Sequence, residues 1–177
     1  QSNVYQRDMV NLCNTVLALT TFSFDISVFE IFLSLINGLR VVLSDEEENL
    51  SAELLAKLII ENDIDVVHST PTKFLTFLNN ENFQKAVRKL KVLMIGAEVF
   101  TDEIYNTISK YTNAIIYNGY GPTETTIGAS FKKITDKTDI TIGRPIANTQ
   151  IYILDKYKKP LPVGIAGELC ISGDGVG

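Results

Sequence analysis

Histidine and cysteine are scarce in this chain, which has 177 residues but one histidine and two cysteines. Cys13 and Cys170 lie far apart without the short spacing of metal ligands, and His68 stands alone. A structural zinc ion takes about four nitrogen or sulfur ligands, so the sequence argues against such a site. With so little cysteine, we expect the protein to work in the reducing cytoplasm.

Long runs of basic or apolar residues are also missing. The formal net charge is −5, and no basic run provides the electrostatic footprint of a nucleic-acid-binding protein. No apolar run approaches the roughly 20 residues that cross a bilayer, and the start of the chain lacks a signal-peptide pattern. We therefore expect neither a nucleic acid nor a membrane as a partner. The acidic residues 45–48 (DEEE) are interpreted as a solvated loop.

Hydrophobic residues make up 45% of the chain, enough to bury the core of one domain or a large subdomain. Residues 25–36 are apolar at nearly every position, and only Glu30 is charged, which predicts a helix buried on most sides. Residues 39–43 (LRVVL) predict a buried strand. Residues 51–61 predict a helix whose first residue, Ser51, is its N-cap.

Strand and helix patterns alternate through the middle of the chain. Strands are predicted at residues 64–68, 91–95 and 114–117, and helices are predicted to begin near Pro71 and after Thr101 as an N-cap. This alternation indicates right-handed βαβ crossovers and hence a parallel sheet.

The last third of the chain has a different pattern. Residues 150–155 and 168–172 predict strands joined by turns rich in proline and glycine, in an antiparallel or barrel-like arrangement. The predicted fold is therefore α/β, with a parallel sheet and flanking helices over residues 1–133 and a smaller, mostly β part of the same core over residues 134–177. Because the chain stops in a glycine-rich turn directly after a strand pattern, we expect it to be truncated.

Small and hydrogen-bonding residues follow three of the predicted strands, at residues 69–71 (STP), 96–98 (GAE) and 118–121 (NGYG). In open parallel sheets, ligands bind beyond such carboxyl ends. The densest group is residues 118–126 (NGYGPTETT), which combines an aromatic ring, two glycines, three threonines and a carboxylate. A nucleotide triphosphate with magnesium requires such groups. The alternative is a structural Gly-Pro turn whose tyrosine packs on the core.

Four stretches occur in the order and spacing of one enzyme superfamily, namely residues 24–27 (FDIS), 96–98, 118–126 and 167–175 (GELCISGDG). With the connecting residues 142–155 (IGRPIANTQIYILD), they resemble the adenylate-forming, AMP-binding enzymes, and specifically the adenylation domains of nonribosomal peptide synthetases. The resemblance covers all but about the first 20 residues.

The resemblance implies an enzyme that joins an amino acid to ATP, releases pyrophosphate and then loads the aminoacyl group onto a carrier-protein thiol. It implies carrier-protein and condensation domains as partners in the parent protein, and phosphopantetheine on the carrier. It also implies that Tyr120 stacks on adenine, that Thr123 contacts the α-phosphate and that Glu124 holds Mg²⁺. The implied catalytic residues are Thr123 and Glu124, and the implied nucleotide contacts are Gly96, Ala97, Glu98, Asn118, Tyr120, Gly121 and Thr123.

For the amino acid, the resemblance implies that Asp25 pairs with the substrate α-ammonium, because an unpaired buried cation would cost several kcal/mol. The alternative is that Asp25 is the N-cap of the helix beside it, and the two roles can coexist. His68 would meet a polar tip on a fairly large side chain, or it is a structural histidine. The implied substrate-binding set is Asp25, Ile26, Phe29, His68, Met94, Gly96, Gly119, Ile127 and Gly128.

Several parts of the family pattern have no counterpart in the sequence. These are the phosphate loop upstream of Phe24, the downstream aspartate that holds ribose, the hinge, and the small carboxy-terminal domain with its catalytic lysine. We therefore expect the chain alone to be inactive, with exposed surface where the missing parts pack.

Three other readings remain open. An acyl- or aryl-CoA ligase shares the tyrosine, threonine and glutamate pattern, although Asp25 counts against it. A non-catalytic binding module would use the glycine turns only for structure. A dinucleotide-binding domain is suggested by the glycines at 173, 175 and 177, but its fingerprint is incomplete.

Overall fold

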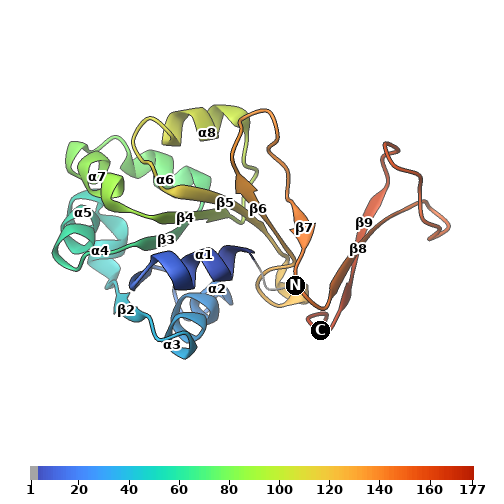
Figure 1. The fold of residues 1–177 in the computed structure, drawn as a ribbon, viewed down its shortest axis with the longest axis horizontal. Helices are drawn as coiled ribbons and strands as arrows, with labels where there is room; N and C mark the ends of the chain where they lie inside the picture. The colour runs from blue at the N-terminus through green and yellow to red at the C-terminus, as the bar shows by residue number, and fades with distance from the viewer. Residues whose placement is uncertain (1–3) are drawn as a thin grey trace.

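The computed structural model describes residues 4–177, which form a layered α/β body and a projecting β-hairpin (Figure 1). The strands are β1 Thr15–Ala18, β2 Arg40–Leu43, β3 Val66–Ser69, β4 Val92–Gly96, β5 Ile115–Tyr120, β6 Ser130–Ile134, β7 Arg144–Pro145, β8 Thr149–Leu154 and β9 Glu168–Gly173. The helices are α1 Val4–Leu12, α2 Ile26–Val28, the π-helical turn η1 Phe29–Leu33, α3 Ser34–Ile36, α4 Glu46–Leu50, α5 Ala52–Glu61, α6 Pro71–Phe77, α7 Glu81–Ala86, α8 Asp102–Ile108, and the 3₁₀ turns η2 Val87–Lys89 and η3 Thr123–Thr125.

A seven-stranded sheet lies at the centre of the body, in the order β2-β1-β3-β4-β5-β6-β7. The first five strands in this order are parallel, whereas β6 and β7 run antiparallel to their neighbours. Strands β8 and β9 pair only with each other, as an antiparallel hairpin. The parallel sheet and its helices confirm the predicted fold class. Within residues 4–177, no helix is long and apolar enough to cross a membrane.

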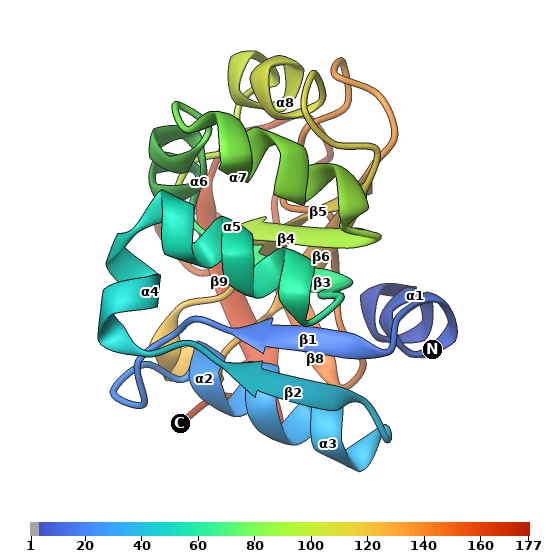
Figure 2. The same ribbon diagram turned by 90° about the vertical axis from the view of Figure 1, so that its left-hand side faces the viewer.

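The two faces of the sheet have separate cores, because side chains alternate between the faces along each strand. Helices α5 to α8 cover one face, and α1 with α2 and α3 lie on the other (Figures 1 and 2). On β3, Val67 belongs to the core under α5 to α8, whereas Val66 belongs to the core that includes Tyr5 and Met9 of α1. His68 contacts the ring of Tyr5 and so lies on the α1 face.

The strand order places a ligand-binding position between β1 and β3. The chain leaves β1 toward β2 at the sheet edge and then returns across β1 to form β3. The loops after β1 and β3 therefore diverge and leave a crevice, which is where open α/β sheets bind ligands.

Several predicted element boundaries are confirmed. The hydroxyl of Ser51 accepts a hydrogen bond from the N–H of Leu54, and Thr101 does the same for Ile104. Both are therefore N-caps, as the sequence indicated. Helix α6 begins at Pro71, where the missing N–H of proline costs no helical hydrogen bond.

The prediction of a loop at residues 45–48 is wrong. These residues enter α4, and Asp45 and Glu48 form a capping box in which each side chain accepts from the backbone N–H of the other. Carboxylates are favourable in the first turn of a helix because they offset the positive end of its dipole.

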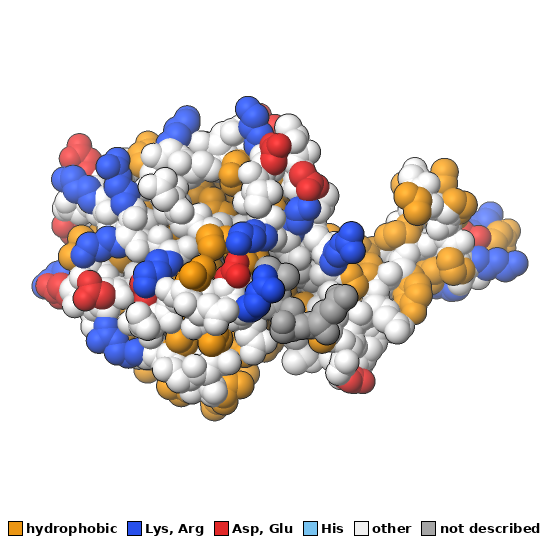
Figure 3. Space-filling view, in the orientation of Figure 1, with side chains coloured by type: hydrophobic (Ala, Val, Ile, Leu, Met, Phe, Trp, Pro, Cys, Tyr) orange, Lys and Arg blue, Asp and Glu red, His pale blue; other side chains and the backbone are white. Residues whose placement is uncertain are grey.

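The segment 25–36 is helical as predicted, but its predicted burial is wrong. Its buried residues are polar, among them Glu30 at 0% exposure, whereas Phe32 and Ile36 are 60% and 79% exposed. Hydrophobic side chains accordingly gather over the edge formed by α2 and α3 (Figure 3). Strand β2 was also predicted to be buried, but it lies at the sheet edge and is partly exposed.

The seven-stranded sheet continues past residue 133, because β7 pairs with β6. Only β8 and β9 form the separate β part, and the division of the core at residues 133 and 134 stays a prediction.

Candidate active site

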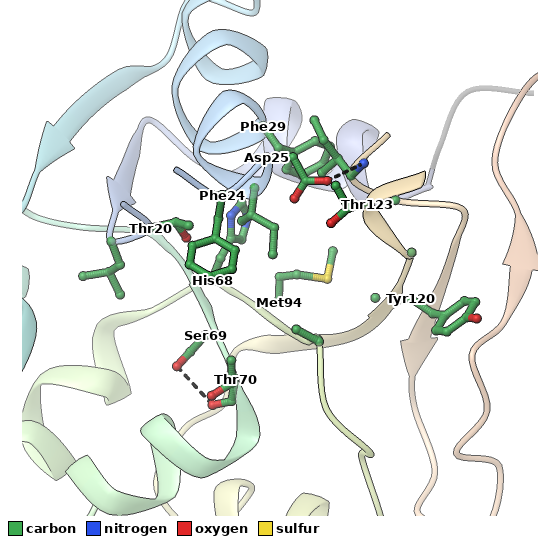
Figure 4. Close-up of a pocket in the computed structure, with 18 of the residues that line it drawn as sticks. Thr20, Phe24, Asp25, Phe29, His68, Ser69, Thr70, Met94, Tyr120 and Thr123 are labelled. Atoms are coloured by element: carbon green, nitrogen blue, oxygen red, sulfur yellow. Dashed lines mark hydrogen bonds between the residues drawn. The ribbon is translucent and has the colours of Figure 1, made fainter. Parts of the chain in front are cut away.

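A cavity of about 430 Å³ opens at the carboxyl ends of the parallel strands. In Figure 4, Asp25 lies on one side of this cavity with Phe29 beside it, and His68 and Met94 come from neighbouring strands. Every residue that the sequence assigned to substrate binding lines the cavity. Its lining comprises Leu19, Thr20, Thr21, Phe24, Asp25, Ile26, Phe29, Asn49, His68, Ser69, Thr70, Lys73, Met94, Gly96, Ala97, Gly119, Tyr120, Gly121, Thr123, Ile127, Gly128 and Phe131.

Asp25 precedes α2 but does not cap it. Its backbone is already helical, and its side chain makes no hydrogen bond to the first turn. Instead, Oδ2 of Asp25 accepts a hydrogen bond of 3.1 Å from the backbone N–H of Ile127. The N-cap interpretation of Asp25 is therefore wrong. Asp25 is the only carboxylate among the described residues that line the cavity.

The turn that carries Ile127 is strained. Thr126 and Ile127 have φ angles of 57° and 72°, which are rare for β-branched residues. A Cβ atom on Gly121 would lie 2.4 Å from the carbonyl oxygen of Ile127 and 2.6 Å from Cα of Gly128. Gly121 is therefore needed for the packing of this turn, as well as lining the cavity.

His68 belongs to a buried polar chain below the cavity. Its Nε2 hydrogen-bonds the hydroxyl of Tyr5, and its Nδ1 lies 3.5 Å from Oε1 of Glu30. Glu30 also accepts hydrogen bonds from the backbone N–H groups of Leu19 and Thr20 and from the Thr20 hydroxyl. Burial raises the pKa of Tyr5 well above its ordinary value, so its hydroxyl stays protonated.

The three glycines of the predicted pocket do not simply leave empty space. Gly96 and Gly119 are paired across β4 and β5, and a Cβ on Gly96 would lie 2.8 Å from the Gly119 carbonyl oxygen. A Cβ on Gly128 would collide with the ring of Phe131 at 2.7 Å, and a Cβ on Gly119 would lie 2.9 Å from Sδ of Met94 and 3.1 Å from the Phe131 ring. Phe131 was not predicted as a lining residue, because no motif contains it.

A second cavity, of about 560 Å³, lies on the other side of the β5 end. Tyr120 lines both cavities, and in Figure 4 its ring points away from the first. The second cavity also contains Asn118, whose amide donates to the carbonyl oxygen of Thr141 over 2.9 Å. Ala97 and Glu98 form its rim. This arrangement gives a flat aromatic ring beside an open space large enough for a purine.

Glu98 links the loop after β4 to the start of α6 by hydrogen bonds. Its Oε2 accepts from the backbone N–H and the hydroxyl of Thr72, at 3.0 Å and 2.6 Å. These hydrogen bonds hold the pKa of Glu98 below its ordinary value. Glu98 thereby joins the loop after β4 to the start of α6, which fixes the edge of the second cavity.

Thr123 lines the first cavity, but Glu124 lines neither. Glu124 lies in the turn η3 with an exposed side chain, and its carbonyl oxygen accepts from the N–H of Gly177. Within residues 4–177, no group of three or more histidine, cysteine, aspartate or glutamate residues forms a metal site. One free carboxylate suits Mg²⁺, which takes one or two carboxylates together with phosphate oxygens and waters.

Two further residues that line the first cavity, Asn49 and Lys73, were not predicted from the sequence. The ammonium of Lys73 donates to Oδ1 of Asn49 and lies 5.6 Å from the ring centre of Phe77. Burial lowers the pKa of Lys73. The charge of Glu30 opposes this shift. The sequence signal for Lys73 was therefore Glu30, the single charge in an apolar segment, because a buried charge demands partners.

Comparison with known proteins adds to this geometry. A family model described as "AMP-binding enzyme" matches residues 1–177. The chain belongs to the AMP-binding enzyme family. It is 38% identical over 160 residues to malpibaldin synthetase of Mortierella alpina and 37% identical over 163 residues to a dimodular nonribosomal peptide synthase of Bacillus subtilis (strain 168). These alignments cover 87% and 91% of the chain, but only 3% and 7% of those proteins.

Solved structures of this AMP-binding family have the same fold. A four-domain nonribosomal peptide synthetase bound to AMP and glycine matches with a TM-score of 0.87 at 32% identity, over 98% of the chain and 13% of that protein. A protein with adenylation and carrier domains, bound to a vinylsulfonamide inhibitor, matches with a TM-score of 0.82 at 28% identity, over 93% of the chain and 29% of that protein. The chain thus spans a small part of its relatives.

Proposed function

We propose that this chain is part of an adenylation domain that activates an amino acid with ATP to give aminoacyl-AMP and pyrophosphate. The observation that carries the proposal is the position of Asp25. Its carboxylate lines the first cavity, makes no helix cap and is the only carboxylate among the described lining residues. A substrate α-ammonium entering this apolar cavity needs such a partner, because an unpaired buried cation costs several kcal/mol.

The two cavities support a separate position for each substrate. Asp25 orients the amino acid through its α-ammonium, while Tyr120 offers its ring to the adenine and Asn118 lies beside the same space. Thr123, at the border of the first cavity, supplies a hydroxyl to the α-phosphate. Glu124 would hold Mg²⁺, which offsets the charge that develops on the phosphate oxygens. Holding the carboxylate of the substrate amino acid near the α-phosphate of ATP supplies much of the rate acceleration through proximity.

For the parent protein we propose loading of the aminoacyl group onto the phosphopantetheine thiol of a carrier-protein domain, next to a condensation domain, in the cytoplasm. The relatives support this proposal, since one matching structure contains adenylation and carrier domains and one relative is bacitracin synthase 3 of Bacillus licheniformis. The product would be a secondary metabolite such as a peptide antibiotic. We further propose that the chain alone is inactive and that the full-length protein supplies the remaining catalytic groups.

Amino-acid-dependent exchange of labelled pyrophosphate into ATP by the full-length protein tests the proposal. We expect exchange with one or a few amino acids. Exchange only with acids that lack an amino group would assign the protein to the acyl- or aryl-CoA ligases. No exchange with any acid would favour a non-catalytic binding module.

A further inference from the structure

The ring of Phe131 occupies the space that two pocket glycines leave open. A Cβ on Gly128 would lie 2.7 Å from Cζ of Phe131, and a Cβ on Gly119 would lie 2.9 Å from Sδ of Met94 and 3.1 Å from Cε1 of Phe131. Both distances to Phe131 are shorter than ordinary contact between carbon atoms. Phe131 therefore acts as a wall of the cavity, and the glycines make room for this wall rather than for a larger substrate.

Two further aromatic rings fix the position of this wall. Phe131 stacks on Tyr5 and on Phe29, with ring centres 5.7 Å and 6.1 Å apart and interplanar angles of 25°. Tyr5 and Phe29 also stack on each other, at 5.6 Å. Each ring thus packs on the other two, so that Phe131 cannot turn aside without disturbing both partners.

His68 is part of the same wall but exposes no polar ring atom that a substrate could reach. Its Nε2 hydrogen-bonds Tyr5, and its Nδ1 makes no hydrogen bond but is fully buried, 3.5 Å from the carboxylate of Glu30. The side chain as a whole is only 6% exposed. A hydrogen-bonding tip on a substrate side chain would therefore lose its water shell here without a replacement.

The charged side chains that line the cavity also have partners already. Among the described lining residues these are Asp25, which the proposed function assigns to the α-ammonium, and Lys73, which donates to Asn49. The lining also includes Met94 and Ile127, which are apolar. A charged substrate side chain would have no free partner in this part of the cavity.

We propose that Phe131 is a specificity-determining residue that closes an apolar subsite, and that this subsite takes an amino acid with an uncharged, apolar side chain. The inference rests on the proposed amino-acid adenylation. It replaces the expectation that His68 meets a polar tip.

The test measures kcat/KM for pyrophosphate exchange across the twenty standard amino acids, using the full-length protein. The variants are Phe131→Ala, which enlarges the subsite, and Phe131→Leu, which removes the ring but keeps an apolar side chain. The control is Phe83→Leu, which removes a buried ring from the core on the other face of the sheet. If Phe131→Ala gives no folded protein, the same kcat/KM values measured on Phe131→Leu decide the question.

We expect the unaltered protein to prefer apolar amino acids. In Phe131→Ala, the kcat/KM ratio of larger to smaller apolar amino acids should rise roughly tenfold or more, since one or two methylene groups in a pocket change selectivity by about that factor. Phe131→Leu should shift the ratio less, and Phe83→Leu should leave it unchanged.

Three results would overturn the inference. One is a preference of the unaltered protein for charged or hydrogen-bonding side chains, and another is an equal loss for all amino acids in both Phe131 variants. In both cases amino-acid adenylation itself would stand. The third, absence of exchange with every amino acid in the unaltered protein, would remove the proposed function as well.

Discussion

The carboxylate of Asp25 accepts a hydrogen bond of 3.1 Å from the backbone N–H of Ile127, 102 residues later in the sequence. This contact joins the start of the α2 segment to the turn that follows the NGYGPTETT motif. Ile127 has the unfavourable φ of 72°, and a hydrogen bond to a carboxylate helps to hold it there. The proposed amino-acid and nucleotide sites therefore share one structural element, so that a change that displaces this turn should affect both sites.

We predict that Gly121→Ala impairs both substrates together. The added methyl group would lie 2.4 Å from the Ile127 carbonyl oxygen and 2.8 Å from the backbone nitrogen of Ala129, and backbone atoms cannot turn aside as a side chain can. We expect a destabilisation of about 1–3 kcal/mol and a fall in kcat/KM of roughly 100-fold. The measurements are pyrophosphate exchange and hydrogen exchange of residues 121–129.

Gly177→Ala is the matched control for this substitution, because its methyl group would meet only the carbonyl oxygen of Glu124, at an ordinary 3.7 Å. Equal behaviour of the two alanine variants would show that the turn has room to move.

We predict that Glu124→Gln reduces turnover without harming the fold. The side chain is exposed and lines neither cavity, so the free energy of unfolding should change by less than about 0.5 kcal/mol. Loss of the charge should raise the Mg²⁺ concentration for half-maximal exchange by roughly tenfold or more. Glu103→Gln, an exposed carboxylate at the start of α8, provides the control. An unchanged Mg²⁺ dependence would remove Glu124 from the proposed metal site.

A pH-dependent contact is predicted where α1 packs on the sheet. The carboxylate of Asp8 accepts hydrogen bonds of 2.7 Å from the Tyr117 hydroxyl and from the Lys133 ammonium. Burial raises the pKa of Asp8, but the hydrogen bonds from Lys133 and Tyr117 outweigh it and hold the pKa below its ordinary value of 3.8. Because the folded pKa is the lower one, this stabilisation is present above pH 3.8 and is lost as the pH falls through the folded value.

Asp8→Asn should therefore lower the opening free energy of α1 by about 1 kcal/mol at pH 7, since the pair is partly exposed and screened by solvent. The difference from the unaltered protein should shrink below pH 3.8. Hydrogen exchange of α1 in the full-length protein, corrected for intrinsic rates, measures both quantities. A difference that is as large at pH 3 as at pH 7 would show that Asp8 acts through packing rather than charge.

The sequence predicted the parts of the fold that follow from local pattern. Ser51 and Thr101 are caps because a hydroxyl at that position satisfies a free N–H, which requires only neighbouring residues. Strand β1 was missed, although it lies beside β3 in the sheet, because four residues are too few to show a period. Its place in the sheet depends on pairing with β2 and β3, which local pattern does not contain.

From the sequence, only those residues of the candidate site that lie within its motifs were predictable. The residues assigned to substrate binding all line the cavity. The contacts of Tyr5 with His68 and of Phe131 with Gly128 were not predictable, because they join residues that are distant in sequence or outside any motif. From sequence alone, Asp25 could have been a helix cap. In the structure its side chain accepts a hydrogen bond from Ile127 instead.

The most direct test of amino-acid activation is pyrophosphate exchange by Asp25→Asn in the full-length protein, with the preferred amino acid and with its analogue that lacks the amino group. Asparagine keeps an oxygen that accepts from Ile127 but loses the charge that would pair with the ammonium. We predict that kcat/KM for the amino acid falls roughly 100-fold, about 3 kcal/mol, while the analogue and ATP binding change little. Equal loss for both acids, or no loss for either, would contradict the pairing of Asp25 with the substrate.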